Sequence, residues 1–427
     1  MQSESSGPPQ IPPHIIARPE HIVSRRDIDV EALKVLYRLH HAGYTAYLVG
    51  GSVRDLLLSK TPKDFDVVTD ARPGELRKLF RNSRIIGRRF RLVQVFFKGG
   101  HIVEVSTFRC RSEFDELAES EAGPAKDTTY GTPAEDAQRR DLTINGLFYN
   151  IADFSLVDYV GGMEDLEARR IRVIGDPAVR FVRDPVRMLR VQRHAARIGF
   201  TIDAAAWEEI LAKGHLIRTC PPARVRDELL KDFHSGAARP FFKLMLDSKL
   251  FYAIFPAWAG RLGFSGESRL LELIGRLDLL VQNGYPLSDS LLWAVFLTAF
   301  LEPELQPRDF KELREFIQER IKAALGGIEF PRARQDEVSQ MLALEQRVAP
   351  LLAKGQPIPA RLTRLRLYPL TWLLHQIKTA PEMELLERCD PEAIPIPPPP
   401  AKRRRQRRRR PRGRRRGKEA TGTGGEG

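Results

Sequence analysis

Apolar residues in the first 110 positions follow two alternating spacings. Stretches with apolar residues three and four positions apart indicate amphipathic helices, and VEALKVLYRLHHAG, residues 30–43, is the clearest of them. Shorter apolar runs bounded by glycine indicate strands, and KGGH at 98–101 is typical of a hairpin turn between two strands. We predict helices in 30–43, 52–60 and 72–83, and strands in 45–51, 64–69, 91–97 and 101–109.

The pattern changes after Asn150. Residues 157–175 predict a small ribbon, and from Asp184 to Glu387 the apolar spacing is mostly helical. The Pro-rich run EAIPIPPPP, residues 392–400, predicts a stiff extended spacer. The sequence therefore predicts an α+β fold, in which a small mixed-sheet head is followed by mostly helical neck and body domains. The predicted segments are a loose N-terminal arm (1–24), the head (25–150), the neck (151–238), the body (239–390) and a linker with a tail (391–427).

Positive charge is concentrated at the end of the chain. The net charge is +14, and residues 401–427, with thirteen Lys and Arg and two Glu, hold +11 of it. A run of like charge is typical of a disordered interaction segment, and such a basic one binds RNA phosphates without regard to sequence. Association with ribosomes or another polyanion is the alternative.

Cysteine usage and hydropathy restrict where the protein works. Cys110, Cys220 and Cys389 match no paired spacing and no zinc pattern, so we expect a reduced, cytosolic protein. No run of about 18 apolar residues is present, so we expect no membrane-spanning helix. The N-terminal residues do not resemble a secretory signal.

Two aspartates one residue apart are the first candidates for chemistry. Asp64 and Asp66 would point to the same face of an extended strand, where their charges repel unless a cation lies between them. Mg²⁺ prefers carboxylate oxygens together with substrate phosphates. Glu104 interrupts a second apolar strand and is the natural third ligand if the two strands pair. Three such acids suit a two-metal phosphoryl or nucleotidyl transfer site, and the alternative is a set of solvent-facing strand residues.

The turn that precedes the acid pair is a candidate phosphate site. Gly50, Gly51 and Ser52 stand between a predicted strand and a predicted helix, so the backbone can approach a phosphate and the helix N-terminus offers free N–H groups. Arg54, on the first turn of that helix, adds a positive charge. A tight turn that only needs positive φ is the alternative. A phosphate cradle a dozen residues before an acid pair is a stronger signal than either feature alone.

The stretch LVGGSVRDLLL…KDFDVVT resembles the head motif of class II nucleotidyltransferases in the polymerase-beta superfamily, which comprise the bacterial poly(A) polymerases and the CCA-adding tRNA nucleotidyltransferases. Four further motifs follow in the family's order: RRDLTINGLFYN, DYVGGMEDL, RDPVRMLRVQRHAARIGF and PPARVRDELLKDF. The resemblance covers residues 25–235. It implies a polymerase-beta-like nucleotidyltransferase head with two Mg²⁺ ions as cofactors and ATP as substrate.

The resemblance also assigns roles to the later motifs. In QRRDLTIN it places Arg140 and Asp141 beside the triphosphate and ribose, with Asn145 in support, and the alternative is a charged helix start capped by Asp141. In RDPVRM it presents Asp184 and Arg187 to the base of the incoming nucleotide, whereas the residues alone favour Asp184 as a helix N-cap. The expected catalytic residues are Asp64, Asp66, Glu104 and Asp141.

Further basic residues on the same helix, Arg190 and Arg193, are expected to face phosphates. Arg224 and Glu228 are spaced for a surface ion pair, but the resemblance implies a brace for the nucleotide-binding helix. One departure from the family is Arg183, which stands where the family usually has a glutamate that orients the base-reading arginine. Strict selection of the base is therefore not implied.

Secondary features favour polyadenylation over CCA addition. A basic stretch in 79–97 leads into a strand, and the charged segment 111–140 is longer than most CCA-adding enzymes need. None of the nine histidines is followed by Asp, so the histidine-aspartate phosphohydrolase signature, a common addition to CCA-adding enzymes, is absent from the sequence. The expected function is template-independent transfer of AMP to RNA 3′ ends in the cytoplasm. The alternatives are a CCA-adding or A-adding tRNA nucleotidyltransferase and a non-catalytic RNA-binding protein. Expected partners are RNA 3′ ends, held partly by the Arg-rich tail, and by family analogy RNA-decay or RNA-chaperone proteins.

Overall fold

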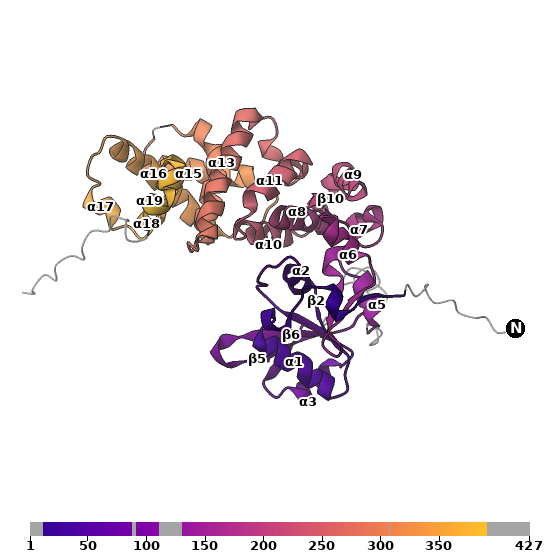
Figure 1. Cartoon of the computed structure of the whole chain (residues 1–427). Helices are drawn as coiled ribbons and strands as arrows, with labels where there is room; N and C mark the ends of the chain where they lie inside the picture. Colours follow the sequence, from indigo (N-terminus) through magenta and orange to yellow (C-terminus); the bar gives the residue numbers. More distant parts are fainter. Residues whose placement is uncertain (1–11, 88–90, 111–129, 307, 391–427) are drawn as a thin grey trace, which may run out of the picture.

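The structure is a computed structural model, which describes residues 12–87, 91–110, 130–306 and 308–390. Figure 1 shows a head built around a β-sheet, from which a series of helices leads to a helical body. Among the described residues, no helix is both long enough and apolar enough to cross a membrane. The predicted linker and basic tail, 391–427, lie outside the described residues.

Eight strands form one mixed sheet in the head, in the order β1-β8-β7-β2-β3-β6-β5-β4. Strands β3 and β6 are parallel, whereas the strands on either side of them pair antiparallel. The strands are β1 (His14–Ile16), β2 (Ala46–Val49), β3 (Asp66–Thr69), β4 (Ser83–Ile86), β5 (Leu92–Phe96), β6 (Ile102–Thr107), β7 (Leu147–Asn150) and β8 (Leu156–Asp158).

Helix α1 (Val30–His41) forms as the apolar spacing predicts. Asp29 caps it, because its carboxylate accepts hydrogen bonds from the first backbone N–H groups of the helix. The apolar side chains of α1 are buried in one cluster with inward-facing residues of the strands, including Leu48 and Val67. A smaller apolar cluster, which includes Val68 and Phe148, contains the alternate residues of these strands. The remaining head helices are α2 (Gly51–Leu57), α3 (Pro73–Leu79) and α5 (Pro133–Gln138).

The head sheet extends beyond both predicted head boundaries, 25 and 150. Within the range predicted as a loose arm, residues 14–16 form the edge strand β1, because Ile16 is buried against the sheet and the strand pairs with β8. Strand β8, which was predicted as part of a ribbon, pairs with β7 across a short loop and buries all three of its residues. Strand β4 was not predicted, because three of its four residues are exposed and its pattern is weak.

The neck continues from the sheet as short helices and a two-stranded parallel pair, β9 (Arg170–Ile171) and β10 (Thr201–Ile202). Gly199 ends its longest helix in the left-handed conformation, with φ 72°, as glycine readily does. The neck helices are α6 (Gly162–Glu167), α7 (Pro177–Arg183), α8 (Val186–Ile198), α9 (Ala204–Lys213) and α10 (Pro222–Phe233).

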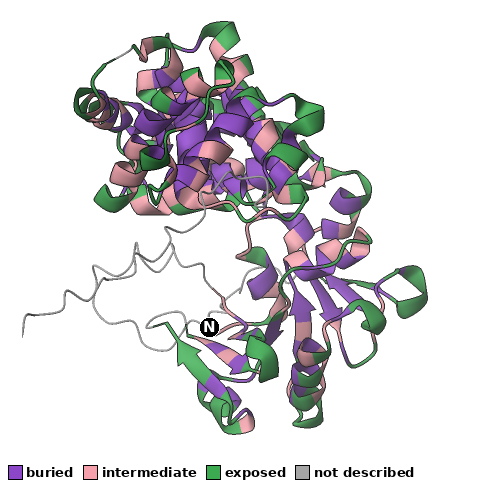
Figure 2. Cartoon of the chain, turned by 90° about the vertical axis from the view of Figure 1, so that its left-hand side faces the viewer, coloured by how far each residue is buried: buried purple, intermediate pink, exposed green. Residues whose placement is uncertain are grey.

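The body is entirely helical among its described residues, and its core surrounds α14 (Asp289–Leu301), in which every residue after Asp289 is buried. Figure 2 shows the buried segments gathered inside the body and along the sheet of the head. The other helices are α11 (Ala238–Asp247), α12 (Leu250–Ile254), α13 (Gly263–Gln282), α15 (Phe310–Leu325), α16 (Arg332–Ala353), α17 (Ala360–Thr363), α18 (Tyr368–Thr379) and α19 (Leu385–Arg388).

The predicted fold class is confirmed, since a mixed-sheet head precedes helical domains. One cluster of buried side chains runs continuously from Leu142 to Cys389 and joins neck and body. The predicted boundary between neck and body, between residues 238 and 239, lies inside this shared core. The exact limits of the two domains therefore stay a prediction.

Candidate active site in the head and neck

The two strands that carry the predicted acids are neighbours in the sheet. Asp66 opens β3 and is the direct partner of Glu104 in the parallel ladder with β6. Residues in such a pair project to the same face, so these two carboxylates share one face of the sheet. Asp64 lies two residues before β3 begins, in the loop that follows α2. The prediction that Asp64 is a strand residue is therefore wrong. All three acids are exposed to solvent.

Asp66 is electrostatically coupled to its neighbours. Partial desolvation raises the pKa of its carboxyl, and the negative charges of Glu104 and Asp64 raise it further, whereas Arg140 acts in the opposite direction. The three carboxylates and Arg140 therefore act on one another although they come from separate segments. A cation would relieve the repulsion among the acids.

The acids are not drawn together around a common point. Glu104 accepts a hydrogen bond of 2.9 Å from Gln94 on β5, its other neighbour in the sheet. Across the described residues, no three side chains of His, Cys, Asp or Glu gather as a group that could hold a metal ion. The chemistry of the donors nevertheless suits Mg²⁺, because they are three solvent-accessible carboxylates.

The glycine turn lies beside the acids. Gly50 has φ 77° and ψ −139°, a combination that only glycine adopts readily, and it joins β2 to α2. A Cβ at Gly50 would lie 3.5 Å from Nη1 of Arg140. The Nε and Nη2 groups of Arg140 donate to the buried carboxylate of Asp136, at 3.1 and 2.8 Å. A guanidinium is therefore held over the turn, as an anion site requires.

The side chain of Arg54, which was predicted to add a positive charge at the turn, is directed into the protein. Its side chain is 9% exposed and donates to Asp55 and, through Nη1, to Oδ1 of Asn145 at 2.7 Å. The same Nη1 contacts Nδ1 of His194 on α8 at 3.2 Å. Arg54 thus joins the head helix to α8, and Asn145 acts as its acceptor.

Asp141 connects the head to α8. One of its carboxylate oxygens lies 2.5 Å from Nη1 of Arg187 and the other lies 2.7 Å from Nη1 of Arg190. Residues 143–145 after it form one short turn and β7 follows, so the alternative of a long helix capped by Asp141 is wrong. Arg190 is 39% exposed, and it is the more accessible arginine of the two.

Asp184 is held by arginines from two helices. Its carboxylate is 1% exposed and accepts two hydrogen bonds from Arg224 on α10, at 2.7 and 3.0 Å. Nε of Arg187 lies 3.6 Å from the same carboxylate. Asp184 is therefore not the N-cap of α8, a place taken by Pro185, and its side chain instead orients Arg187.

Arg193 is buried away from solvent. Its Nε donates to both oxygens of Asp232 at 3.0 Å, its Nη2 donates to the carbonyl of Glu228 at 2.9 Å, and its Nη1 forms an ion pair with the Glu228 carboxylate. These contacts occupy the guanidinium, so Arg193 is not placed to face phosphates as we expected. Arg224 binds Asp184, two residues before α8 begins, and Glu228 binds Arg193 on α8, which is the arrangement that a brace requires.

Three residues of this network were not predicted as site residues: Asp136, His194 and Asp232. Asp136, on α5, stands three and four positions before Arg139 and Arg140, which follow the helix, and this ion-pair spacing was a readable signal. Asp232 likewise follows Glu228 by one helical turn on α10. No sequence signal pointed to the contact of His194 with Arg54.

Two family models match the chain. The first, described as "Poly A polymerase head domain", matches residues 46–172, which contain the acids, the glycine turn and Asp141. The second, described as "Probable RNA and SrmB- binding site of polymerase A", matches residues 199–261, from the end of α8 into the body.

Similar curated proteins include a poly(A) polymerase I from Escherichia coli O6:H1, 45% identical over 290 residues, which are 66% of this chain and 62% of the relative. A CCA-adding enzyme from Lactobacillus helveticus is 32% identical over 278 residues, 65% of each protein. This chain therefore spans less than two thirds of the length of these relatives. Among solved structures, the Bacillus stearothermophilus CCA-adding enzyme in complex with CTP superposes with a TM-score of 0.61 at 24% identity, covering 84% of this chain and 80% of the other, which shows a shared fold.

Proposed function

Because this chain belongs to the class II nucleotidyltransferase family of poly(A) polymerases and CCA-adding enzymes, we propose that it transfers AMP from ATP to RNA 3′-hydroxyls without a template and releases pyrophosphate. The observation that carries the chemistry is the direct pairing of Asp66 with Glu104, beside Gly50 and Arg140. Carboxylates next to a cationic phosphate cradle are the components that nucleotidyl transfer needs.

The acids Asp64, Asp66 and Glu104 would hold two Mg²⁺ ions, because accessible carboxylates are the ligands that Mg²⁺ prefers. When bound, these ions supply Lewis acidity for the attacking hydroxyl and for the leaving pyrophosphate. The raised pKa of Asp66 means that protons compete for this carboxylate, so activity depends on its ionised form.

The remaining site residues would bind and orient ATP. Gly50–Ser52 and Arg140 receive the triphosphate, since their N–H groups lie at the end of the turn. Asp141 positions Arg187 and Arg190, and Asp184 orients Arg187 from the other side. A guanidinium held by two carboxylates keeps one direction, which suits recognition of a nucleotide base.

Polyadenylation is favoured over CCA addition by the higher identity to a poly(A) polymerase, 45% against 32% for a CCA-adding enzyme. Arg183 does not argue against it, because it is an exposed residue at the end of α7. CCA addition is the second candidate, and the two activities differ in product length and nucleotide requirement.

RNA 3′ ends are the proposed partner, and the Arg-rich residues 401–427 would add affinity that does not depend on sequence. The match of 199–261 to a model described by RNA and SrmB binding supports a second, protein partner from RNA decay or RNA remodelling. The place of action is proposed to be the cytoplasm.

The test uses purified full chain, Mg²⁺ and two labelled RNAs, a tRNA that lacks its CCA end and an unstructured oligonucleotide that ends in A. Each RNA receives ATP, CTP or both, and the products are separated on a sequencing gel. A long ladder on the oligonucleotide with ATP alone is expected. Three additions on the tRNA that need CTP first and then stop would replace the proposal with CCA addition.

A further inference from the structure

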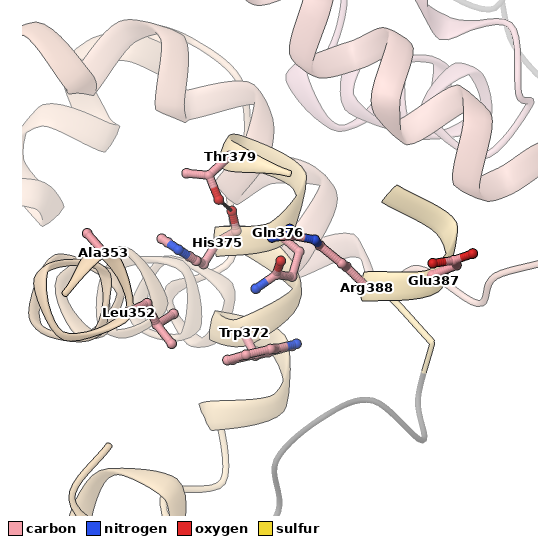
Figure 3. A pocket seen from close by; sticks show the side chains of 8 residues that line it. All are labelled: Leu352, Ala353, Trp372, His375, Gln376, Thr379, Glu387 and Arg388. Carbon is pink, nitrogen blue, oxygen red and sulfur yellow. Dashed lines mark hydrogen bonds between the residues drawn. The ribbon is translucent and has the colours of Figure 1, made fainter. Parts of the chain in front are cut away.

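A pocket of about 590 Å³ lies at the end of the body, between the C-terminus of α16 and helices α18 and α19 (Figure 3). This volume is in the range of about 300–1,000 Å³ that is usual for small-molecule sites. Its polar lining consists of Trp372, His375, Gln376, Thr379, Glu387 and Arg388. None of the predicted catalytic or nucleotide-binding residues lines it.

One face of α18 supplies most of this polar lining. Trp372, His375, Gln376 and Thr379 are separated by three and four positions, so they form a line along the helix. Figure 3 shows Trp372 and Gln376 on successive turns of α18, with the indole ring and the amide both lining the pocket.

Two polar groups in this line have no partner within the described part of the chain. The indole Nε1 of Trp372 is buried and makes no hydrogen bond. The residue Gln376 is only 4% exposed, and its side-chain amide makes no hydrogen bond to a described residue. Because buried polar groups are nearly always hydrogen-bonded, the unpartnered Nε1 of Trp372 marks this wall of the pocket as unusual. The Gln376 amide beside it is available to donate to and accept from a ligand in the pocket.

The base of the pocket is fixed by a buried charge network. Nδ1 of His375 lies 3.0 Å from Oε1 of Glu345, and Nζ of Lys378 donates to Oε2 of the same residue at 2.9 Å. Glu345 is 1% exposed. This network holds α18 against α16, so the pocket is formed before any ligand binds.

The charges at the rim favour an uncharged ligand group. Glu387 would repel a phosphate, and Arg388 is already paired with Glu384, its Nε at 2.8 Å from that carboxylate. A flat ring with donors and acceptors at its edge, by contrast, can stack on the indole of Trp372 and bond to Gln376. Base stacking on aromatic side chains is the usual means of holding single-stranded RNA.

We propose that this pocket binds one adenine base of single-stranded RNA, upstream of the 3′ end that reacts in the head. The amide of Gln376 selects adenine, because a glutamine amide can donate to N7 and accept from the N6 amino group of that base. RNA as the ligand rests on the proposed function, whereas the pocket itself does not. The site would give a growing adenine tail an added contact far from the active site.

The test measures binding of 5′-labelled RNA to the full chain by fluorescence anisotropy, with a twenty-residue adenine RNA (A20) and a twenty-residue uracil RNA (U20). Trp372→Leu should weaken A20 binding about tenfold, while Trp372→Phe, which keeps an aromatic face, should lose less than about threefold. Gln376→Leu should abolish the preference for A20 over U20. Trp207→Leu, at a half-buried tryptophan in the neck, is the matched control and should not change binding.

AMP transfer to a four-residue primer separates this inference from the proposed function. Helix α18 lies at the end of the body away from the head (Figure 1), so Trp372→Leu should leave extension of such a short primer unchanged. Wild-type A20 affinity in Trp372→Leu, or an unchanged A20 preference in Gln376→Leu, would overturn the adenine pocket. Absence of AMP transfer in the wild type would instead refute the proposed function and leave the binding result valid.

Discussion

Removing Arg224 tests the brace between α10 and α8. Arg224 donates two hydrogen bonds to Asp184, whose carboxylate is 1% exposed and keeps Arg187 at 3.6 Å when Arg224 is removed. Breaking a buried ion pair by removing one partner costs about 3–5 kcal/mol. Because the Arg224 side chain is 30% exposed and Arg187 remains, we expect Arg224→Ala to lower the free energy of unfolding by about 2–3 kcal/mol.

Equilibrium urea unfolding, followed by circular dichroism, measures this decrease. Arg226→Ala is the matched control on the same helix. Its partners Asp227 and Glu329 are 57% and 58% exposed, and surface pairs contribute less than about 1 kcal/mol. The double variant Arg224→Met with Asp184→Asn should recover much of the stability, since it leaves no buried charge unpaired.

The same substitution has an expected consequence for nucleotide binding. Arg187 would lose its orientation when Asp184 is no longer held, so KM for ATP should rise several-fold in Arg224→Ala while RNA affinity is unchanged. An unfolding free energy within about 0.5 kcal/mol of the Arg226→Ala control would contradict the buried brace. A coupling energy near zero in the double-mutant cycle would contradict it as well.

Three further results are expected. Asp64→Ala should reduce AMP transfer by about 10³-fold or more and leave RNA binding nearly unchanged, as filter binding would show, and normal activity would refute the metal assignment. Burial and the charges of Arg54, Arg190, Arg193 and Arg197 hold the pKa of His194 well below its usual value. The unfolded chain therefore binds the extra proton as pH falls below about 6.5, and stability should decrease by up to about 1.4 kcal/mol per pH unit. His194→Gln, which keeps an acceptor for Arg54, should make stability in thermal melts depend less on pH between 7 and 5. An unchanged pH dependence would contradict the role of His194. Deletion of 401–427 should weaken RNA binding and reduce its dependence on salt by about 0.7 in the log–log slope for every RNA phosphate that the tail neutralises, whereas identical binding at low salt would exclude a role for the tail.

Much of the fold was predictable because its signals are local. The period of apolar residues identified α1, and short apolar runs identified the strands β2, β5 and β6. The edge strands β1 and β4 were missed, since three and four residues with few buried positions carry too little pattern. Pairing makes them strands: β1 pairs with β8, which is far away along the chain, and β4 pairs with β5.

The sequence by itself determined which chemical groups this protein has, namely the acids near β3 and β6, the glycine turn and the arginines of α8. Which of those groups remain open was decided only by tertiary structure. Arg187, Arg190 and Arg193 are spaced three apart on one helix, yet Arg190 is 39% exposed and Arg193 is 6% exposed. The difference arises because α10 brings Glu228 and Asp232 against one side of α8, whereas Asp141 reaches the other side from the head. A charge in a sequence has no fixed partner, and folding assigns the partner through contacts between residues that are far apart along the chain.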